Sequence, residues 1–335
     1  MLSPSDFITL PYTSDLSEGG IAYATRSLPH TYDRMGGSKT ARMRRIAAGI
    51  AVELALRRLL DRQEVAFDTL GATPFTEPDR YDVSIGGRRV DVKSFLLTSR
   101  RKIRSVLQAP SRLLEAAALV PSDQMDTERF KPNDVYLFAF LLGLVTRDRE
   151  SLAKAQAAGH PVYLIHPMPR DWASPQVWHP LGELALKSER PPALSLQLGG
   201  QDGERRFLTC EVRLPHLTRR TCPGDFHTLV YLHSDQLPEG RVGVYSPTLG
   251  ETHLIPPLVS EQGWGNLWVY GMKIILAGYI TKGEFRQKAR RLPPGSSTFQ
   301  YRSTRTENFA LPVRELHPLS ALLDAAREWQ EGRTL

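Results

Sequence analysis

The stretch DVSIGGRRVDVKSF, residues 82–95, gives the clearest indication of how this chain folds. Two short strand-like runs flank a pair of adjacent glycines, which permit the positive φ angles that a tight turn between strands requires. The stretch therefore predicts a β-hairpin. Because side chains alternate along a strand, we expect Asp91 and Lys93 on one face of the second strand and Val92 on the other.

Regular structure is also expected on both sides of this hairpin. Residues 38–62 carry apolar side chains at helical spacing, with Ser38 as the N-cap. The apolar run DVYLFAFLLGL, residues 134–144, is typical of a central strand that is covered on both faces. A helix is expected over 100–119, so the predicted order is helix, strand, strand, helix, strand.

The hairpin contains the residue types that phosphodiester hydrolysis needs. Such a reaction uses a hard cation bound by oxygen ligands, a positioned water and positive charge near the reacting phosphate. The carboxylates of Asp82 and Asp91 could bind the cation, together with the carbonyl oxygen of Val92. Lys93 could position or activate the water.

Glu53 adds a third carboxylate. On a helical wheel it lies within about 20° of Ile46 and Leu60, in the middle of the apolar face. A buried carboxylate is costly unless a cation or a metal is its partner, so we expect Glu53 to face the hairpin. In the alternative interpretation Glu53 reaches solvent, and Asp82, Asp91 and Lys93 form an ordinary exposed face of a hairpin, with Lys93 paired to a carboxylate.

In this order of elements and residues the chain resembles the PD-(D/E)xK nuclease superfamily, which has the restriction-endonuclease-like fold. The matching residues are Glu53, Asp82, Asp91 and Lys93. The segment GYITKGEF, residues 278–285, resembles a closing strand and helix of some members. The resemblance implies an α/β fold with a mixed sheet flanked by helices, Mg²⁺ or Mn²⁺ as the cofactor, and cleavage of DNA or, less often, RNA.

One position departs from the pattern of that superfamily. The proline that normally precedes the first aspartate is displaced, because Tyr81 precedes Asp82 and the pair Pro78-Asp79 lies upstream. Asp79 is therefore a competing metal ligand. We prefer Asp82, because it opens the strand that pairs with the strand carrying Asp-Val-Lys.

Basic residues flank these positions in three runs. Phosphate contacts supply sequence-independent affinity for nucleic acid, so we expect these runs to bind the substrate backbone. They are Arg100, Arg101, Lys102 and Arg104 after the hairpin, Lys39, Arg42, Arg44 and Arg45 at the start of the first helix, and Lys282, Arg286, Lys288, Arg290 and Arg291 on a helix expected over 282–291 with Thr281 as its N-cap. Gln108 or Gln124 could assist the site, and their spacing does not choose between them.

The 335 residues are enough for two domains. Beyond Arg147 prolines become frequent and short strand-like runs follow one another, as in a β-sandwich or barrel. We therefore expect a β-rich domain inserted into an α/β core. The expected ranges are 1–37 for an extended N-terminal arm with little core, 38–145 for the nuclease core, 146–265 for the inserted domain, and 266–335 for the return to the core and a terminal helix over 321–330. Strands are expected over 194–198, 207–214, 227–233, 241–246, 266–270 and 273–280.

Composition and charge limit the class of protein. The 43 basic and 36 acidic side chains give a formal charge of +7, which favours a polyanionic partner such as nucleic acid. No apolar run is long enough to span a bilayer and no secretory signal pattern is present, so we expect a soluble cytoplasmic protein. The only cysteines, Cys210 and Cys222, are expected to be free thiols.

The sequence thus predicts a Mg²⁺-dependent endodeoxyribonuclease, and analogy assigns it to restriction or defence against foreign DNA. Two alternatives stay open: an effector nuclease that is silent until a protein partner activates it, and a catalytically inactive nucleic-acid-binding protein. A homodimer is a further expectation, because cutting both strands with one site per chain often takes two chains.

Overall fold

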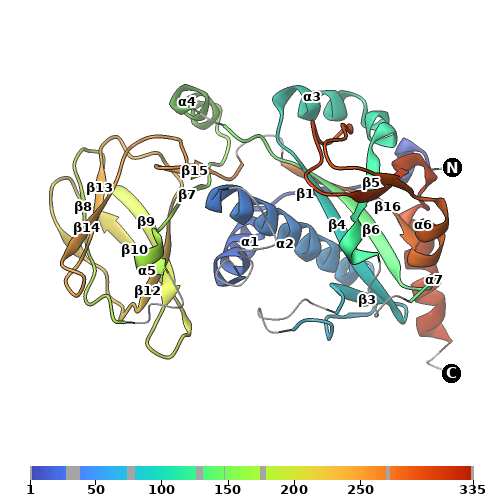
Figure 1. Ribbon diagram of the computed structural model, residues 1–335, viewed down its shortest axis with the longest axis horizontal. Coiled ribbons are helices and arrows are strands. Elements are labelled where there is room, and N and C mark those ends of the chain that lie inside the picture. The colour runs from blue at the N-terminus through green and yellow to red at the C-terminus, as the bar shows by residue number, and fades with distance from the viewer. Residues whose placement is uncertain are drawn as a thin grey trace. The chain divides into compact units, whose positions relative to one another are not determined.

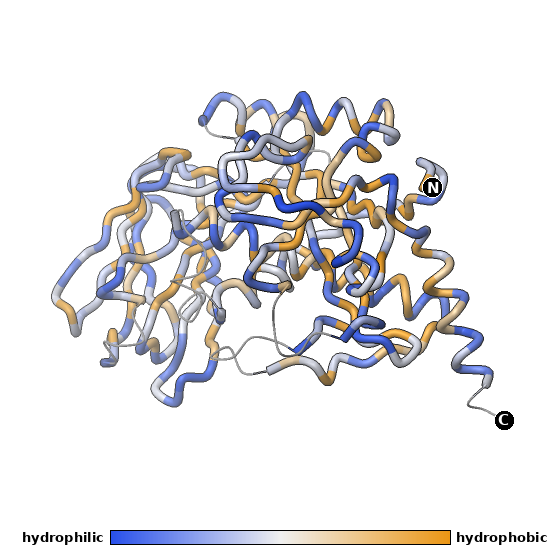
Figure 2. The backbone as a smooth tube through the Cα atoms, turned by 45° about the vertical axis from the view of Figure 1, so that its right-hand side comes forward, coloured by the Kyte–Doolittle hydropathy of each residue, from blue (hydrophilic) through white to orange (hydrophobic). Residues whose placement is uncertain are grey.

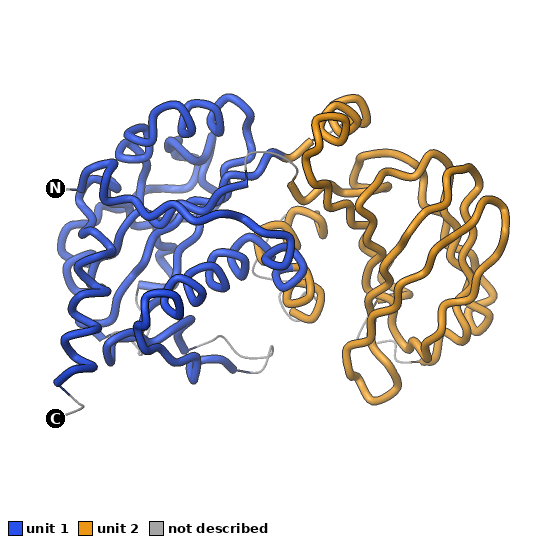
Figure 3. Tube along the Cα trace, turned by 180° about the vertical axis from the view of Figure 1, so that it is seen from behind, with its two compact units in different colours: residues 1–20, 47–144, 271–335 blue, residues 21–46, 145–270 orange. Residues whose placement is uncertain are grey.

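The computed structural model describes residues 2–27, 38–73, 80–125, 131–146, 148–173, 179–268 and 272–332. The chain forms two compact units, which Figure 3 shows in separate colours. Unit 1 comprises residues 1–20, 47–144 and 271–335, and unit 2 comprises residues 21–46 and 145–270. Within the described ranges, no helix is long and apolar enough to cross a membrane.

Unit 1 contains a six-stranded mixed sheet. Its strands are β1 (Ile8–Pro11), β2 (Phe67–Asp68), β3 (Val83–Ile85), β4 (Arg88–Leu97), β6 (Val135–Leu142) and β16 (Lys273–Thr281). The strand order is β1-β16-β6-β4-β3-β2, in which β4 and β6 run parallel and the other neighbours are antiparallel. The predicted hairpin is confirmed, because Gly86 and Gly87 adopt φ angles of 55° and 72° between β3 and β4.

β6 lies between β4 and β16, and all of its residues are buried. This confirms the prediction of a central strand covered on both faces. On one face, the rings of Tyr136 and Phe138 pack against Phe285 of α6 (Lys282–Lys288), with ring centroids 5.4 Å and 5.9 Å apart. Figure 2 shows the backbone coloured by hydropathy, with hydrophobic residues in orange.

α2 (Lys39–Arg62) is the helix that precedes the hairpin. It begins at Ser38, whose Oγ accepts a hydrogen bond from the backbone N–H of Ala41 at 3.3 Å, as expected of an N-cap. It packs closely against Gly20, where a Cβ would lie 2.5 Å from the carbonyl oxygen of Ala47. The expected apolar stripe is confirmed only in part, at Leu56 and Leu60, which are buried. Ile46, Ile50 and Leu54 are only half-buried, whereas Ala47, Ala51 and Ala55 are buried.

The N-terminal segment is not the extended arm that the sequence predicted. β1 pairs with β16 at the edge of the sheet, and α1 (Ser14–Ser27) is a helix of 14 residues. Leu16, Ile21 and Ala24 of α1 are buried. The expectation of little core was wrong because this helix is stabilised by packing, which its weak apolar period and its two adjacent glycines do not reveal.

Two predicted helices are shorter than expected. α3 (Arg100–Gln108) ends before Pro110, which opens a 3-10 helix, and β5 (Ala117–Pro121) follows. Proline lacks an N–H group and disfavours helical geometry in the preceding residue, so the helix cannot continue to residue 119.

α6 also ends before its expected limit at residue 291. It begins at the predicted cap, where Oγ1 of Thr281 accepts a hydrogen bond from the backbone N–H of Glu284 at 3.2 Å. β17 (Arg290–Leu292) then pairs with β18 (Asn308–Pro312), which pairs with β5. This three-stranded sheet joins residues far apart in sequence, so local propensity does not indicate it. The terminal helix, α7 (Leu319–Glu331), is confirmed.

Unit 2 contains two antiparallel sheets, labelled in Figure 1. The strands of the first, in the order β10-β9-β12-β7-β15, are β10 (Phe207–Leu214), β9 (Leu194–Gln201), β12 (Thr228–Ser234), β7 (Leu164–Pro167) and β15 (Gly265–Asn266). The strands of the second, in the order β11-β8-β13-β14, are β11 (Arg220–Thr221), β8 (Ala185–Ser188), β13 (Val242–Ser246) and β14 (Glu251–Ile255). The unit also contains two short helices, α4 (Arg149–Ala157) and α5 (Arg170–Ala173), and the parts of α1 and α2 that lie within residues 21–46.

The expected strands of this region are confirmed, except that the one predicted over 266–270 is limited to β15, and residues 269–271 lie outside the described chain. Cys210 and Cys222 are buried free thiols, as expected.

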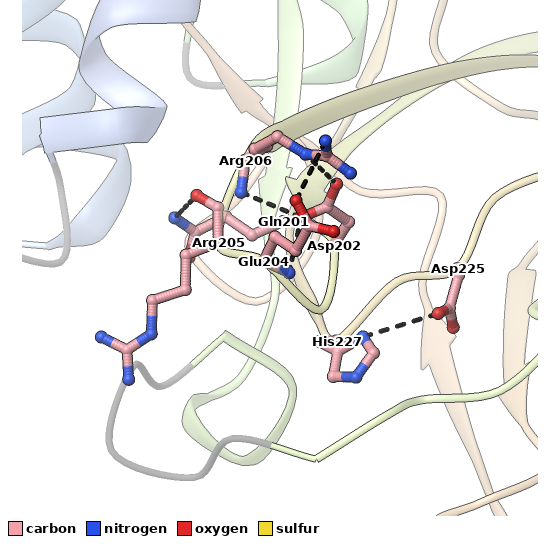
Figure 4. A network of polar contacts seen from close by, with 7 residues as sticks. All are labelled: Gln201, Asp202, Glu204, Arg205, Arg206, Asp225 and His227. Atoms are coloured by element: carbon pink, nitrogen blue, oxygen red, sulfur yellow. Dashed lines mark hydrogen bonds and ion pairs between the residues drawn. The ribbon is translucent and has the colours of Figure 1, made fainter.

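A charged turn closes the hairpin between β9 and β10 (Figure 4). Oδ1 of Asp202 accepts hydrogen bonds from the backbone N–H groups of Glu204 and Arg206, each at 2.9 Å. Oδ2 of Asp202 accepts a further bond from Nε of Arg206 at 2.9 Å. An aspartate that bonds to the backbone two residues on fixes a tight turn, so these charges hold the register of the hairpin.

Candidate active site

The hairpin places Asp91 and Lys93 next to each other on β4. The Nζ atom of Lys93 lies 2.6 Å from Oδ1 of Asp91, so the two side chains share one face of the strand, as their spacing predicted. Both are partly buried, with 26% of the Asp91 side chain and 14% of the Lys93 side chain exposed. They therefore form an ion pair that solvent still reaches.

Asp82 lies beside the same stretch of β4. It immediately precedes β3, and its Oδ2 accepts a hydrogen bond from the backbone N–H of Val92 at 2.6 Å. This contact involves the N–H of Val92, whereas the predicted metal ligand is the carbonyl oxygen of that residue. In the described chain the part of β4 that pairs with β3 is Arg88–Val90, which leaves the edge of β4 without a strand partner on this side from Asp91 onward. The site therefore lies at an open strand edge.

Gln124 is a second partner of Lys93. Nζ of Lys93 donates to Oε1 of Gln124 at 2.7 Å, and Gln124 ends the short 3-10 helix η4 (Ser122–Gln124) that follows β5. Gln108, the other glutamine considered, is exposed at the C-terminal end of α3. The position of η4 depends on the pairing of β5 with β18, which spacing along the sequence does not show.

Lys282 joins the site from α6, although the sequence analysis placed it only in a basic run. Its Nζ lies 3.8 Å from Oδ2 of Asp91 and 4.8 Å from the ring centroid of Tyr136. Nζ of Lys93 lies 5.6 Å from the same centroid. Two ammonium groups thus share one carboxylate and one aromatic ring. The available signal was the segment GYITKGEF, in which a lysine opens a helix directly after a strand that pairs with β6.

Burial controls the protonation of two neighbouring groups. It raises the pKa of the Tyr136 hydroxyl, and the charge of Asp91 raises that pKa further, so the phenol stays neutral. Burial also raises the pKa of the Asp134 carboxyl, while the charges of Lys282 and Arg89 oppose this rise. Lys282 therefore interacts with both the partly buried carboxylate of Asp91 and the buried carboxyl of Asp134.

Glu53 lies at the edge of the buried face of α2 rather than in its middle, with 18% of its side chain exposed. Its Oε2 accepts a hydrogen bond from Nη2 of Arg57 at 3.5 Å. The same nitrogen donates to the backbone carbonyl of Asp82 at 3.4 Å. Arg57 therefore links Glu53 to the start of β3.

α2 and the Asp91–Lys93 pair lie on different faces of β4. A Cβ at Gly49 would lie 3.7 Å from Oγ of Ser94, so α2 covers the face that carries Ser94. Side chains alternate along the strand, which places Asp91 and Lys93 on the other face, next to β6 and α6. The structure therefore brings together Asp82, Asp91 and Lys93, while Glu53 approaches from the opposite side of the sheet.

Oxygen ligands for a hard cation are present at this edge. The carboxylates of Asp82 and Asp91 lie beside the same backbone stretch, and Mg²⁺ and Mn²⁺ prefer such ligands. Across the described residues, no three Asp, Glu, His or Cys side chains gather closely enough to hold a metal ion. Asp79, the competing ligand, lies outside those residues.

The basic run on α3 has mixed surroundings. Arg100, Arg101 and Arg104 are exposed. Nζ of Lys102 instead donates to the carbonyl oxygen of Gln300 at 3.3 Å, and burial lowers the pKa of this lysine. Three of the four residues thus remain available to a phosphate backbone.

Lys39 and Arg45 belong to the part of α2 that lies in unit 2. Nζ of Lys39 donates to the carbonyl oxygen of Met168 at 2.8 Å, and burial lowers its pKa. Arg44, between them in the sequence, donates to the carbonyl oxygen of Asn266 at 2.5 Å. Lys39 and Arg44 thus contribute to packing within unit 2, and the role of this run in phosphate binding stays a prediction.

Comparisons with known proteins found no similar protein. No family model matches this chain, and no curated protein and no solved structure is significantly similar to it. The assignment of the site rests on the contacts described above.

Proposed function

We propose that this protein is a metal-dependent nuclease with a restriction-endonuclease-like core, and that its site lies at the open edge of β4. The observation that carries the proposal is that Asp82 and the Asp91–Lys93 pair lie along the same stretch of β4, next to the start of β3. The order of α2, the β3–β4 hairpin, α3 and the parallel strand β6 also supports it, because the resemblance to PD-(D/E)xK nucleases implies this order.

Each residue has a role that its contacts support. Lys93 is oriented by Asp91 and Gln124, so its remaining N–H can hold the attacking water or the developing negative charge of the phosphate. Asp82 and Asp91 would hold Mg²⁺ or Mn²⁺, which when bound polarises the phosphate and lowers the pKa of a bound water. Glu53, linked to Asp82 through Arg57, is an outer partner of the same set.

DNA is the proposed substrate. Exposed Arg100, Arg101 and Arg104 on α3 follow β4 directly and would bind the phosphate backbone. A homodimer that cuts both strands, a cytoplasmic location and a role in restriction or defence belong to the same proposal, as does an extension of the substrate range to RNA.

The test is a cleavage assay on supercoiled plasmid, linear duplex, single-stranded DNA and RNA, with Mg²⁺, Mn²⁺ or EDTA. We expect cleavage that EDTA abolishes, and a loss of about 10²–10⁴-fold in rate for Lys93→Ala and for Asp91→Asn, because each removes a group that acts on the reacting phosphate.

The matched control for this assay is Lys154→Ala. Lys154 also pairs with a carboxylate, that of Glu150, but on the exposed surface of α4, where 70% of its side chain is exposed. Its cleavage rate should equal that of the unchanged protein. Full activity in both Lys93→Ala and Asp91→Asn would refute the proposed mechanism.

A partner-activated nuclease is the second candidate, and the position of Lys282 favours it. The two oxygens of Asp91 each face an ammonium group, of Lys93 at 2.6 Å and of Lys282 at 3.8 Å. These groups compete with a metal ion for the carboxylate, so a partner that moves α6 would free it. Cleavage only after addition of a partner protein would support this candidate. Metal-independent DNA binding that survives Lys93→Ala, without cleavage under any condition, would instead indicate an inactive binding protein.

A further inference from the structure

The outward face of the second sheet in unit 2 contains a hollow that is lined in part by a glycine, Gly243. In the register of β8, β13 and β14, Gly243 lies between Lys187 and Leu254, and Tyr245 lies between Ala185 and Thr252. These residues alternate with buried ones such as Leu186, Val242 and Val244, so they form the face that points away from the core of unit 2.

Gly243 creates the hollow. β13 is paired on both sides, and a Cβ at residue 243 would lie 3.3 Å from Cδ2 of Leu254 and 3.4 Å from Cγ2 of Thr252. A glycine inside a strand weakens the sheet and often marks a place where a ligand approaches the backbone. The space above it is a pocket of about 410 Å³, which lies within the usual range for small-ligand sites.

The walls of this pocket are apolar and exposed. Leu217 and Leu254 have 54% and 51% of their surface exposed, and both line the pocket. Tyr245 presents its ring beside them, and the guanidinium carbon of Arg219 lies 5.4 Å from the ring centroid. A flat aromatic surface next to two exposed leucines is suited to a planar ring.

The charge at the mouth of the pocket is positive. Lys187 and Arg219 both line it. The one carboxylate in the lining, Glu189, is engaged by Arg241, with N–O distances of 2.8 Å and 2.9 Å. A ligand with a planar ring and a phosphate would therefore meet both an apolar floor and a matching charge.

We infer that this pocket, the Gly243 hollow, binds one unpaired nucleotide of a nucleic-acid strand. The base lies over Gly243 against Tyr245, and the phosphate contacts Lys187 and Arg219. All of these residues belong to unit 2, so the inference does not depend on cleavage by unit 1. It adds a binding site for single-stranded nucleic acid to a chain whose proposed catalytic residues lie elsewhere.

The test is fluorescence anisotropy with labelled single-stranded oligonucleotides of DNA and RNA and with a blunt duplex, in EDTA so that cleavage does not interfere. We expect the single strands to bind more tightly than the duplex. Tyr245→Ala should weaken single-strand binding about tenfold or more, because loss of one stacked base has an effect of this size. Gly243→Val fills the floor and should weaken it similarly.

Lys154→Ala is the control, since Lys154 is exposed on α4 and does not line the Gly243 hollow. Its affinity should stay within about twofold of the unchanged protein. Circular dichroism verifies that each variant is folded, and Tyr245→Ala decides the question should Gly243→Val not fold. Competition by free mononucleotides at micromolar concentration would identify a small-molecule site rather than a strand-binding one.

Three results would overturn the inference: unchanged single-strand affinity in Tyr245→Ala, no affinity for any single strand in the unchanged protein, or displacement of the strand by free mononucleotides. Sedimentation of the unchanged protein and Tyr245→Ala supplies a fourth. If the unchanged chain is a dimer that this variant dissociates, the hollow is covered by a second copy instead of a nucleotide.

Discussion

Two polar clusters of this protein differ in their surroundings. In unit 1, Asp91, Lys93 and Lys282 meet at the open edge of β4, where solvent reaches them. In unit 2, His166 of β7 and His253 of β14 face each other with their Nε2 atoms 2.8 Å apart. The groups at the open edge are within reach of solvent and of a substrate, whereas burial lowers the pKa of the two histidines, which connect strands of two sheets.

The bonds of the histidine pair indicate its protonation. Nδ1 of His166 lies 2.6 Å from the carbonyl oxygen of Gly263, which can only accept, so Nδ1 carries the proton. Nε2 of His166 is then free of a proton and accepts the N–H of His253. Burial lowers the pKa of His166 to about 4, and burial also lowers the pKa of His253.

Lowering the pH should have the largest effect on the free energy of unfolding, because it protonates the histidine pair. The folded-state pKa of His166 is about 4, below the unfolded value of 6.5, so the unfolded chain binds the proton first as the pH falls. The stability that this neutral histidine contributes is complete above pH 6.5 and is lost as the pH falls from 6.5 to about 4. We expect the free energy of unfolding to fall by about 3 kcal/mol over this window.

Urea unfolding at several pH values, followed by tryptophan fluorescence, measures this change. Trp264 lies 6.1 Å from the His166 ring and reports on unit 2. His166→Gln should remove most of the pH dependence, whereas the same substitution at exposed His216 should leave it intact. A flat stability profile in the unchanged protein would contradict the assigned protonation.

Asp91→Asn should have the next largest effect on stability. It removes the one carboxylate that separates the ammonium groups of Lys93 and Lys282, which then repel each other over the Tyr136 ring. Because the cluster is partly exposed, we expect a loss of about 1–2 kcal/mol in the free energy of unfolding, less than for a fully buried pair.

Denaturant unfolding at low and at 0.5 M salt checks this effect. Glu150→Gln, which removes the exposed carboxylate paired with Lys154, should change the stability by less than about 0.5 kcal/mol. Equal effects of the two substitutions would mean that the edge of β4 is no different from ordinary surface.

Lys282→Ala tests whether the second lysine contributes to cleavage. If it stabilises charge on the phosphate, the rate should fall about tenfold, or about 1.4 kcal/mol in activation free energy. The control is Lys154→Ala on α4, which removes an exposed lysine paired with Glu150 and should leave the rate unchanged. A faster rate in Lys282→Ala would instead show that this lysine holds the site closed, as the partner-activated candidate requires.

Gln124→Ala should have the smallest effect. It removes one hydrogen bond that orients Lys93, so we expect the cleavage rate to fall about threefold to fivefold. Gln108→Ala, at the exposed end of α3, should have no effect. A steady-state assay that gives equal rates for the two variants would exclude Gln124 as a positioning residue.

Strong local signals predicted much of the fold. The glycine pair of the hairpin, the caps Ser38 and Thr281 and the apolar run of β6 each depend on neighbours within a few residues, and all were confirmed. The predictions from sequence were wrong where segments far apart in the chain pair with each other. β5 was expected to be helix, and it is a strand because β18, almost two hundred residues later, bonds to it.

In the candidate site, too, local contacts could be predicted from the sequence and long-range contacts could not. Alternation along one strand places Asp91 and Lys93 together, so sequence sufficed for this pair. Lys282 and Gln124 reach the same point only through α6 and η4, which no spacing along the chain relates to β4. Glu53 was expected to join the pair, but α2 covers the face of β4 that carries Ser94, and Glu53 bonds to Arg57 of its own helix.

The sequence by itself determined the elements and the chemical types that they carry: a hairpin with two carboxylates and a lysine, an apolar central strand, and a β-rich second region. Tertiary structure decided which residues share a face, which lysine and glutamine reach Asp91, and where Gly243 leaves a hollow beside Tyr245. The physical reason is the distance along the chain over which each kind of interaction acts. Turn geometry, capping and side-chain alternation act over a few residues, whereas packing and strand pairing join residues that the order of the chain keeps far apart.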